Sequence, residues 1–175
     1  MLGPIGQRQL AAPALLLALA LPGCSDELED GLSQPSQAPA PGETVRADVT
    51  RHTDGDTFWL SGIGKVRLIG VDTPEVFGER ECYGRRASAF VERMVPVGAR
   101  VRYRLGVEER DRYGRALAYV WLRDGRFLNR LLLARGYAQP LTIPPNVEYE
   151  DMFVRAARRA REAARGLWGR PGCAG

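Results

Sequence analysis

The chain has 175 residues and a hydrophobic content of 45%, which suits one folded domain of ordinary size once terminal and linker segments are set aside. A formal net charge of +4 and a pI near 9.2 favour polyanionic partners, although a charge of this size excludes no other class of partner. Lys65 is the only lysine, so almost all of the positive charge is arginine, whose planar guanidinium is suited to binding phosphate oxygens.

Residues 1–23 have the pattern of a secretory signal. Arg8 precedes an apolar run at residues 10–21, which is shorter than the roughly 20 residues of a membrane helix. The following Pro-Gly-Cys resembles the lipobox of bacterial lipoproteins and predicts a lipid anchor at Cys24, with the protein exported and held at the bacterial cell envelope. Cleavage after Ala20, which would give a soluble secreted or periplasmic protein, is the alternative.

Residues 24–43 are rich in Ser, Gln, Pro and acidic residues, and this composition predicts a disordered linker between the anchor and the domain.

If Cys24 carries lipid, Cys82 and Cys173 remain as a pair in an oxidising compartment. We expect them to form a disulfide, which would contribute about 4–5 kcal/mol by closing a long loop. Two unpaired thiols are the alternative.

The predicted domain covers residues 44–170, with a tail at 171–175. Strand patterns occupy residues 44–51, 57–61, 65–71, 100–107 and 115–122. Helical spacing of apolar residues occupies residues 86–95, 127–135 and 147–165. Short strands in hairpins, with a helix after the third strand, predict an α+β, mainly β fold: a five-stranded OB-fold barrel with three helices, a fold that commonly binds oligonucleotides or oligosaccharides.

Three segments concentrate charged residues. The first is Asp54-Gly55-Asp56, for which a simple turn is the plain interpretation, because Asp-Gly favours two-residue turns. The second is the strand at residues 65–71, which contains Arg67 and is followed by Asp72. A guanidinium within an apolar strand needs an anionic partner. Residues five apart point to opposite faces of a regular strand, so Arg67 and Asp72 can share a site only if the strand bends, and Gly70 would allow the bend.

The third segment is Asp111-Arg112-Tyr113-Gly114-Arg115, a charged turn between two strands. Each segment alone is a weak signal. In this order, among these strands and with Gly166-Leu167-Trp168 near the end, they resemble the staphylococcal nuclease (thermonuclease) family over residues 45–168. The resemblance implies an OB barrel and hydrolysis of DNA and RNA phosphodiester bonds.

The resemblance also implies a calcium site formed by Asp56, Asp72 and the carbonyl of Thr73. Calcium prefers oxygen ligands, and this set offers them. His52 is the only histidine and belongs to no His/Cys cluster, so zinc is disfavoured.

Catalytic roles follow from the same resemblance. Arg67 and Arg115 would stabilise charge on the phosphoryl group, and Glu75 would act as general base or orient the attacking water. Arg112 and Tyr113 would hold the bound nucleotide. No protein partner is indicated, and we expect a monomer. The alternatives are a non-catalytic OB module that binds nucleic acid or glycan at the envelope, and a structural calcium site, which would leave both arginines without a role.

Overall fold

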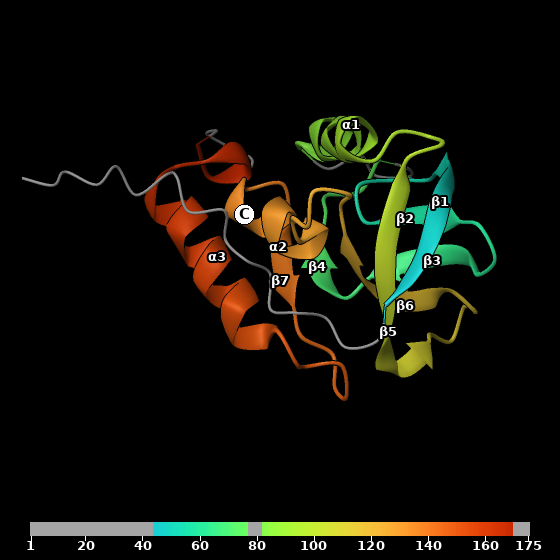
Figure 1. Cartoon of the computed structure of the whole chain (residues 1–175). Coiled ribbons are helices and arrows are strands. Elements are labelled where there is room, and N and C mark those ends of the chain that lie inside the picture. The colour runs from blue at the N-terminus through green and yellow to red at the C-terminus, as the bar shows by residue number, and fades with distance from the viewer. Residues whose placement is uncertain (1–43, 77–81, 170–175) are drawn as a thin grey trace, which may run out of the picture. The chain divides into compact units, whose positions relative to one another are not determined.

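The computed structural model describes residues 44–76 and 82–169, and the statements below concern these residues. Figure 1 shows the arrangement of the elements. In chain order they are β1 (Val45–His52), β2 (Thr57–Leu60), β3 (Gly64–Leu68), β4 (Gly70–Asp72), α1 (Gly84–Met94), β5 (Arg100–Arg110), β6 (Ala116–Trp121), α2 (Leu128–Ala134), β7 (Gln139–Leu141), α3 (Glu150–Glu162) and the 3₁₀ helix η1 (Gly166–Gly169).

Five strands close into a barrel in the order β1-β2-β3-β6-β5, and this confirms the predicted architecture. Strands β3 and β6 pair in parallel, whereas the other barrel neighbours are antiparallel. The two remaining strands, β4 and β7, form a separate two-stranded sheet that the sequence did not predict. In Figure 1, α2 and α3 lie on the side of this small sheet.

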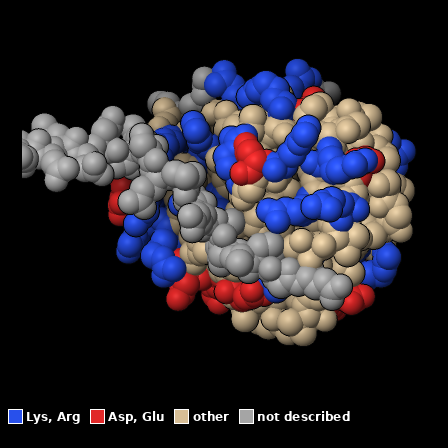
Figure 2. Space-filling model, viewed as in Figure 1, with Lys and Arg blue, Asp and Glu red and all other residues tan. Residues whose placement is uncertain are grey.

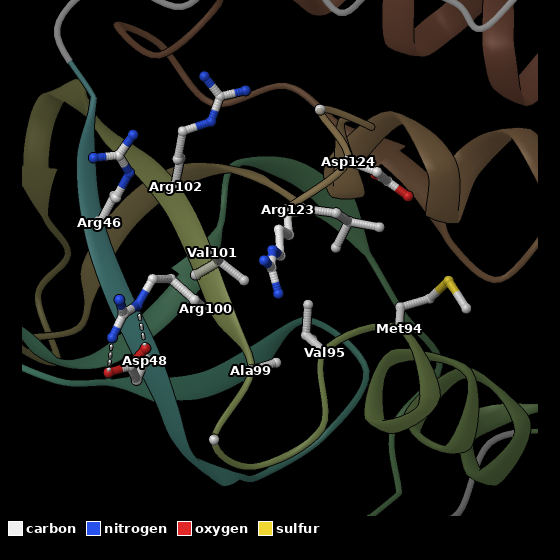
Figure 3. A pocket seen from close by; sticks show the side chains of 13 residues that line it. Arg46, Asp48, Met94, Val95, Ala99, Arg100, Val101, Arg102, Arg123 and Asp124 are labelled. Atoms are coloured by element: carbon white, nitrogen blue, oxygen red, sulfur yellow. Dashed lines mark hydrogen bonds and ion pairs between the residues drawn. The ribbon is translucent and has the colours of Figure 1, made fainter.

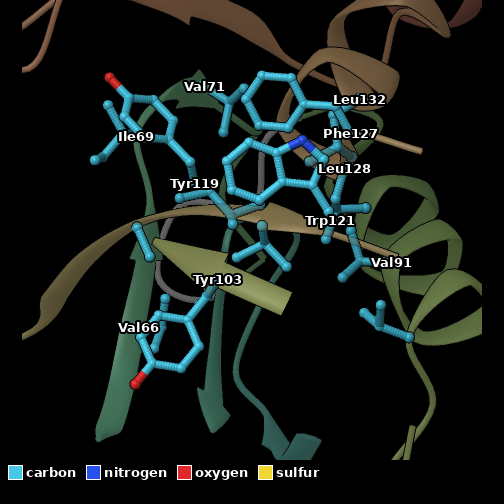
Figure 4. Close-up of a cluster of buried hydrophobic side chains, with 14 of the residues drawn as sticks. Val66, Ile69, Val71, Val91, Tyr103, Tyr119, Trp121, Phe127, Leu128 and Leu132 are labelled. Carbon is cyan, nitrogen blue, oxygen red and sulfur yellow. The ribbon is translucent and has the colours of Figure 1, made fainter. Parts of the chain in front are cut away.

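Alternate residues of the strands fill the barrel interior, and a cluster of buried hydrophobic side chains continues from the barrel to the helices (Figure 4). Aromatic rings just before α2 and α3 belong to this cluster. Trp121 of β6 stacks on Phe127, with ring centroids 4.8 Å apart, and Tyr119 meets Tyr149 edge-to-face at 4.7 Å. Both contacts join the barrel to the helical layer. Burial of apolar surface of this extent is the main favourable term in folding and fixes α2 and α3 against the barrel.

The predicted strand over residues 65–71 is broken into β3 and β4 at Gly70. This glycine has φ of 77°, in the left-handed region that L side chains rarely adopt. A Cβ there would also lie 2.3 Å from the ring of Phe153. The chain therefore bends at Gly70, as predicted, and β4 leaves the barrel to pair with β7.

The last helix is shorter than predicted, and its true bounds correct the interpretation of residues 147–165. A turn in which the N–H of Glu150 donates to the carbonyl of Val147 precedes α3. Ala164, with φ of 47°, ends it, and η1 follows. Helical spacing alone does not mark either change in backbone geometry.

Several predictions fall outside the described residues: the signal at residues 1–23, Cys24, the linker up to residue 43, Cys173 and the tail. Cys82 is disulfide-bonded, and its predicted pairing with Cys173 stays a prediction. Across the described ranges, none of the helices has the length and apolar character needed to span a bilayer.

Candidate active site

Asp56 is the centre of a buried polar network that joins the turn after β1 to the end of β4. Its side chain is 7% exposed, and its Oδ2 lies 2.8 Å from Nη1 of Arg67. Thr73 donates its backbone N–H and its hydroxyl to the same oxygen, at 2.9 and 3.0 Å. The hydroxyl of Thr57 donates to Oδ1 at 3.0 Å. These contacts offset the cost of burying a carboxylate.

Arg67 bridges Asp56 and Asp72, so the bend at Gly70 does bring together two side chains that a regular strand would separate. Nη2 of Arg67 lies 2.9 Å from Oδ1 of Asp72, and Nη1 donates to the carbonyl of Val71 at 2.7 Å. The Arg67 side chain is 13% exposed, whereas that of Asp72 is 57% exposed. One guanidinium thus lies between a buried carboxylate and one that faces solvent.

Asp54 is a residue of this site that the sequence pattern explained only as part of a turn. Its Oδ1 accepts a hydrogen bond from the backbone N–H of Asp56 at 3.1 Å. Burial, followed by the negative charge of Asp56, raises the pKa of Asp54 to about 6. The intervening Gly55 is required, because a Cβ there would lie 2.9 Å from the side chain of Thr73. The Asp-x-Asp spacing was the one sequence signal for this pair.

Arg115 is positioned by the turn between β5 and β6. The carboxylate of Asp111 accepts hydrogen bonds from the backbone N–H groups of Tyr113 and Arg115, at 2.9 and 3.0 Å, and from Nε of Arg115 at 2.6 Å. Burial opposes ionisation of Asp111, but these hydrogen bonds outweigh it and hold the pKa of Asp111 below its usual range. Asp111 therefore fixes both the turn and the Arg115 side chain.

Arg67 and Arg115 line one cavity of about 450 Å³. Arg112 and Tyr113 line it as well, and Tyr113 is 67% exposed with the Arg112 guanidinium 4.8 Å from its ring centroid. The end of β7 and the segment after it contribute Leu141, Ile143 and Asn146 to the lining. The cavity thus brings together the arginines and the tyrosine that the sequence analysis selected. Arg67 and Arg115 are 48 residues apart in the chain.

Asn146 is a second residue that sequence reasoning missed. Its buried amide bonds both backbone groups of Glu108, accepting from the N–H at 3.1 Å and donating to the carbonyl at 2.9 Å. This pair of bonds clamps β5 to the segment that follows β7. The clamp fixes one wall of the cavity, at Leu141 and Ile143.

Glu75 is exposed and is not among the residues that line the cavity. The first residue of α1 packs closely against its backbone, since a Cβ on Gly84 would lie 2.5 Å from the carbonyl oxygen of Glu75 and 2.8 Å from that of Pro74. Only glycine permits this approach. No sequence signal assigned that role to Gly84.

Comparison with known proteins identifies the family. A family model described as staphylococcal nuclease homologue matches residues 65–170. The thermonuclease of Staphylococcus intermedius is 37% identical over 147 residues, covering 81% of this chain and 85% of that protein. The thermonuclease of Staphylococcus hyicus is 37% identical over 126 residues, covering 69% of this chain and 73% of that protein.

The chain belongs to the staphylococcal nuclease homologue family. A further relative, the endonuclease YncB of Bacillus subtilis, is 34% identical over 136 residues, covering 73% of this chain and 64% of that protein. The family predicted from three charged segments is therefore confirmed. In this staphylococcal nuclease homologue the family match includes Arg67, Asp72 and Arg115, while Asp54 and Asp56 precede it.

Proposed function

We propose that this staphylococcal nuclease homologue is a calcium-dependent nuclease that hydrolyses phosphodiester bonds of DNA and RNA. The observation that supports this most strongly is the placement of Arg67 and Arg115 on one cavity, with the carboxylates of Asp56 and Asp72 in contact with Arg67. The nuclease names of the relatives agree with this assignment.

The two arginines would stabilise the transition state. When water attacks phosphorus, negative charge builds on the phosphoryl oxygens, and preorganised donors lower the barrier because they need no rearrangement. Arg67 is held by Asp56 and Asp72, and Arg115 by Asp111, so both guanidiniums are fixed before substrate binds. Nε of Arg67 makes none of the contacts described above and is a candidate donor to phosphate.

Glu75 would take the proton of the attacking water or orient that water. An exposed carboxylate near a metal-binding segment is suited to either role. The close contact between Gly84 and the Glu75 backbone supports the role, because a water-orienting group must be held within a fraction of an ångström.

The carboxylates of Asp56 and Asp72 offer the oxygen ligands that calcium prefers, and an ion bound there would share them with Arg67. Asp54 has a raised pKa because it is buried beside Asp56, and a bound cation would relieve this unfavourable pairing of negative charges. Asp56, Asp72 and the carbonyl of Thr73 would hold the ion, with water as further ligands. In the described ranges no three His, Cys, Asp or Glu side chains form a ready-made metal cluster, so backbone and water must complete the coordination. The ion would supply Lewis-acid stabilisation of phosphoryl charge.

Arg112 and Tyr113 would bind the nucleotide next to the cleaved bond. Tyr113 offers an exposed ring to a base, and Arg112 lies over that ring and can reach phosphate. Across the cavity, Leu141 and Ile143 offer aliphatic rather than aromatic contacts. We therefore expect only weak base stacking on this wall of the cavity.

A gel assay with the purified protein tests the function. Single-stranded DNA and RNA are incubated with calcium, and in parallel with calcium plus an excess of chelator. We expect both substrates to be degraded with calcium and to stay intact with chelator. Intact DNA and RNA under calcium would contradict the proposal, and retained binding without cleavage would instead identify a non-catalytic binding module.

We also propose that the enzyme is exported and anchored to the bacterial cell envelope through Cys24. The apolar run at residues 10–21 and the Pro-Gly-Cys that follows it support this. Cys24→Ser should move the protein from the membrane fraction to the soluble exported fraction. If the variant stays in the membrane fraction, a lipid on Cys24 is not the anchor.

A further inference from the structure

A second cavity, of about 940 Å³, lies on the barrel apart from the catalytic cavity and shares no lining residue with it. It is bounded by β1, the start of β5, the segment that follows α1 and the turn after β6 (Figure 3). We call it the basic groove, because its rim holds Arg46, Arg100, Arg102 and Arg123. Its floor includes the buried side chains of Val95 and Val101.

Two of these arginines are placed at a cost to the fold. Arg46 on β1 and Arg102 on β5 are direct cross-strand partners. Like charges at such positions destabilise a sheet, since the Cβ atoms are only about 4.5–5.5 Å apart. Figure 3 shows both side chains extending the same way from the neighbouring strands. The packing of the barrel gives no reason for this pair.

The acidic residues of the groove are already engaged. Asp48 accepts hydrogen bonds from Arg100 at 2.9 and 3.2 Å, and Asp124 lies 2.7 Å from Nε of Arg126. Among the residues that the structure describes, no carboxylate lies within 4.0 Å of the guanidinium of Arg46, Arg102 or Arg123. We call these last three the groove arginines. They are three positive charges around one concavity with no anion of the described chain to balance them.

We propose that the basic groove binds the phosphate backbone of the substrate strand at a distance from the bond that is cleaved. This inference rests on the proposed nuclease function. Guanidinium forks match phosphate oxygens, and a strand of nucleic acid carries phosphates at regular intervals that three arginines can meet together. The recess, of about 940 Å³, is large enough to admit a strand, and binding of the rim arginines to anionic lipid is the alternative that the vesicle measurement below tests.

Strand β5 links the groove to the catalytic cavity. Arg102 lies near its start, and Asp111, which lines the catalytic cavity, comes directly after its end. The two residues are nine positions apart, which at about 3.3 Å per residue spans at most roughly 30 Å. At the 3.4 Å step of a duplex strand that length corresponds to about nine nucleotides, and a more extended single strand would need fewer. Only substrates of roughly this length or longer would reach both sites.

Figure 2 shows Lys and Arg side chains gathered over the barrel face toward the viewer, with fewer acidic ones among them. A general basic surface would also attract nucleic acid, so the test must separate the groove arginines from other exposed arginines. The groove variant contains Arg46→Gln, Arg102→Gln and Arg123→Gln. The control variant loses the same charge at three exposed arginines elsewhere, through Arg155→Gln, Arg158→Gln and Arg165→Gln.

Binding of fluorescent single-stranded DNA is measured with chelator present, over a range of salt, for strands of about 4 and about 30 nucleotides. Three lost phosphate contacts on a single strand should make the slope of log affinity against log salt about 2 units shallower. Between 50 and 200 mM salt, wild-type affinity for the long strand should then fall about 20-fold more than that of the groove variant. The control variant should keep the wild-type slope.

Equal slopes for wild type and groove variant, or equal losses in both variants, would overturn the proposal. So would a groove variant that keeps its DNA affinity but no longer binds anionic phosphatidylglycerol vesicles, since the groove would then face lipid. If the groove variant does not fold in a thermal unfolding test, Arg123→Gln alone should show a slope about 0.7 units shallower. Because binding is measured without catalysis, failure of the wild type to cleave DNA in calcium would reject the nuclease function separately.

Discussion

Replacing Gly84 by alanine should separate the placement of Glu75 from the stability of the fold. A Cβ on Gly84 would lie 2.5 Å from the Glu75 carbonyl oxygen, whereas ordinary contact begins at 3.4 Å, so the two backbones must separate by about 0.9 Å (3.4 minus 2.5). Alanine is otherwise favourable in a helix. A misplacement near 1 Å can cost about 100-fold in rate. We therefore expect turnover to fall by roughly 10- to 100-fold, with a stability loss of about 1–3 kcal/mol.

A matched control distinguishes the displaced residue from general strain. Gly169→Ala places a Cβ 2.2 Å from the carbonyl oxygen of Ala164, which is a similar clash in η1. It should lower stability in urea unfolding without lowering turnover of a fluorogenic oligonucleotide at saturating substrate and calcium. Glu75→Gln should lower turnover without lowering stability. If Gly84→Ala loses stability but keeps turnover within twofold of wild type, then the contact with Gly84 does not position Glu75 for catalysis.

Three further predictions concern the supports of the site. Asn129 on α2 donates to the carbonyl of Ile69 at 2.8 Å and accepts from the N–H of Val120 at 3.0 Å. Asn129→Ala should therefore lower the free energy of unfolding, measured in urea, by about 2–3 kcal/mol. A decrease below ~0.5 kcal/mol would contradict this role. Asp111→Asn removes the charge that holds Arg115, and turnover should fall at least ~10-fold while the melting temperature changes little; unchanged turnover would contradict this. Burial raises the pKa of Tyr119 from 10.0 to about 12. The stability that this protonated side chain contributes is therefore complete below pH 10 and is lost as the pH rises to about 12. A tyrosinate absorbance titration in which every tyrosine ionises near pH 10 would contradict this prediction.

The barrel could be predicted from sequence because its strands are apolar on one face and several of them are separated by Gly-containing turns. The small sheet could not. Strand β7 has three exposed residues, one of them Pro140, and such a segment has no strand signature of its own. It pairs with β4 only because the bend at Gly70 turns β4 away from the barrel. Pairing of this kind depends on tertiary context rather than on local propensity.

Some residues of the candidate site could be predicted from the sequence, and others could not. Arg67 and Asp72 could be predicted to meet, because a charged residue in an apolar strand requires a partner and a glycine lies between them. The role of Asp54 could not, since Asp-Gly already explains a turn, and its raised pKa arises only from burial beside Asp56. The approach of Gly84 to Glu75 and the clamp from Asn146 to Glu108 join residues that have no sequence pattern in common.

The basic groove also could not be predicted from the sequence, because its residues are far apart in the chain. Arg46 and Arg102 are 56 residues apart, and each alone is an ordinary outward-facing strand residue. Only the antiparallel register of β1 and β5 places them opposite each other. Sequence analysis could report the excess of arginine but could not locate the groove in which three arginines have no ion-pair partner among the described residues.

The most direct test of the account compares the turnover of Arg67→Ala and Arg115→Ala with that of Arg155→Ala, an exposed control on α3, on single-stranded DNA with saturating calcium. Each cavity variant should lose at least ~100-fold in turnover, as expected for removal of a fixed donor to transition-state charge, while circular dichroism shows an intact fold. The control should cleave at the wild-type rate. Near-normal turnover in both cavity variants would contradict the central claim that these two arginines stabilise phosphodiester hydrolysis.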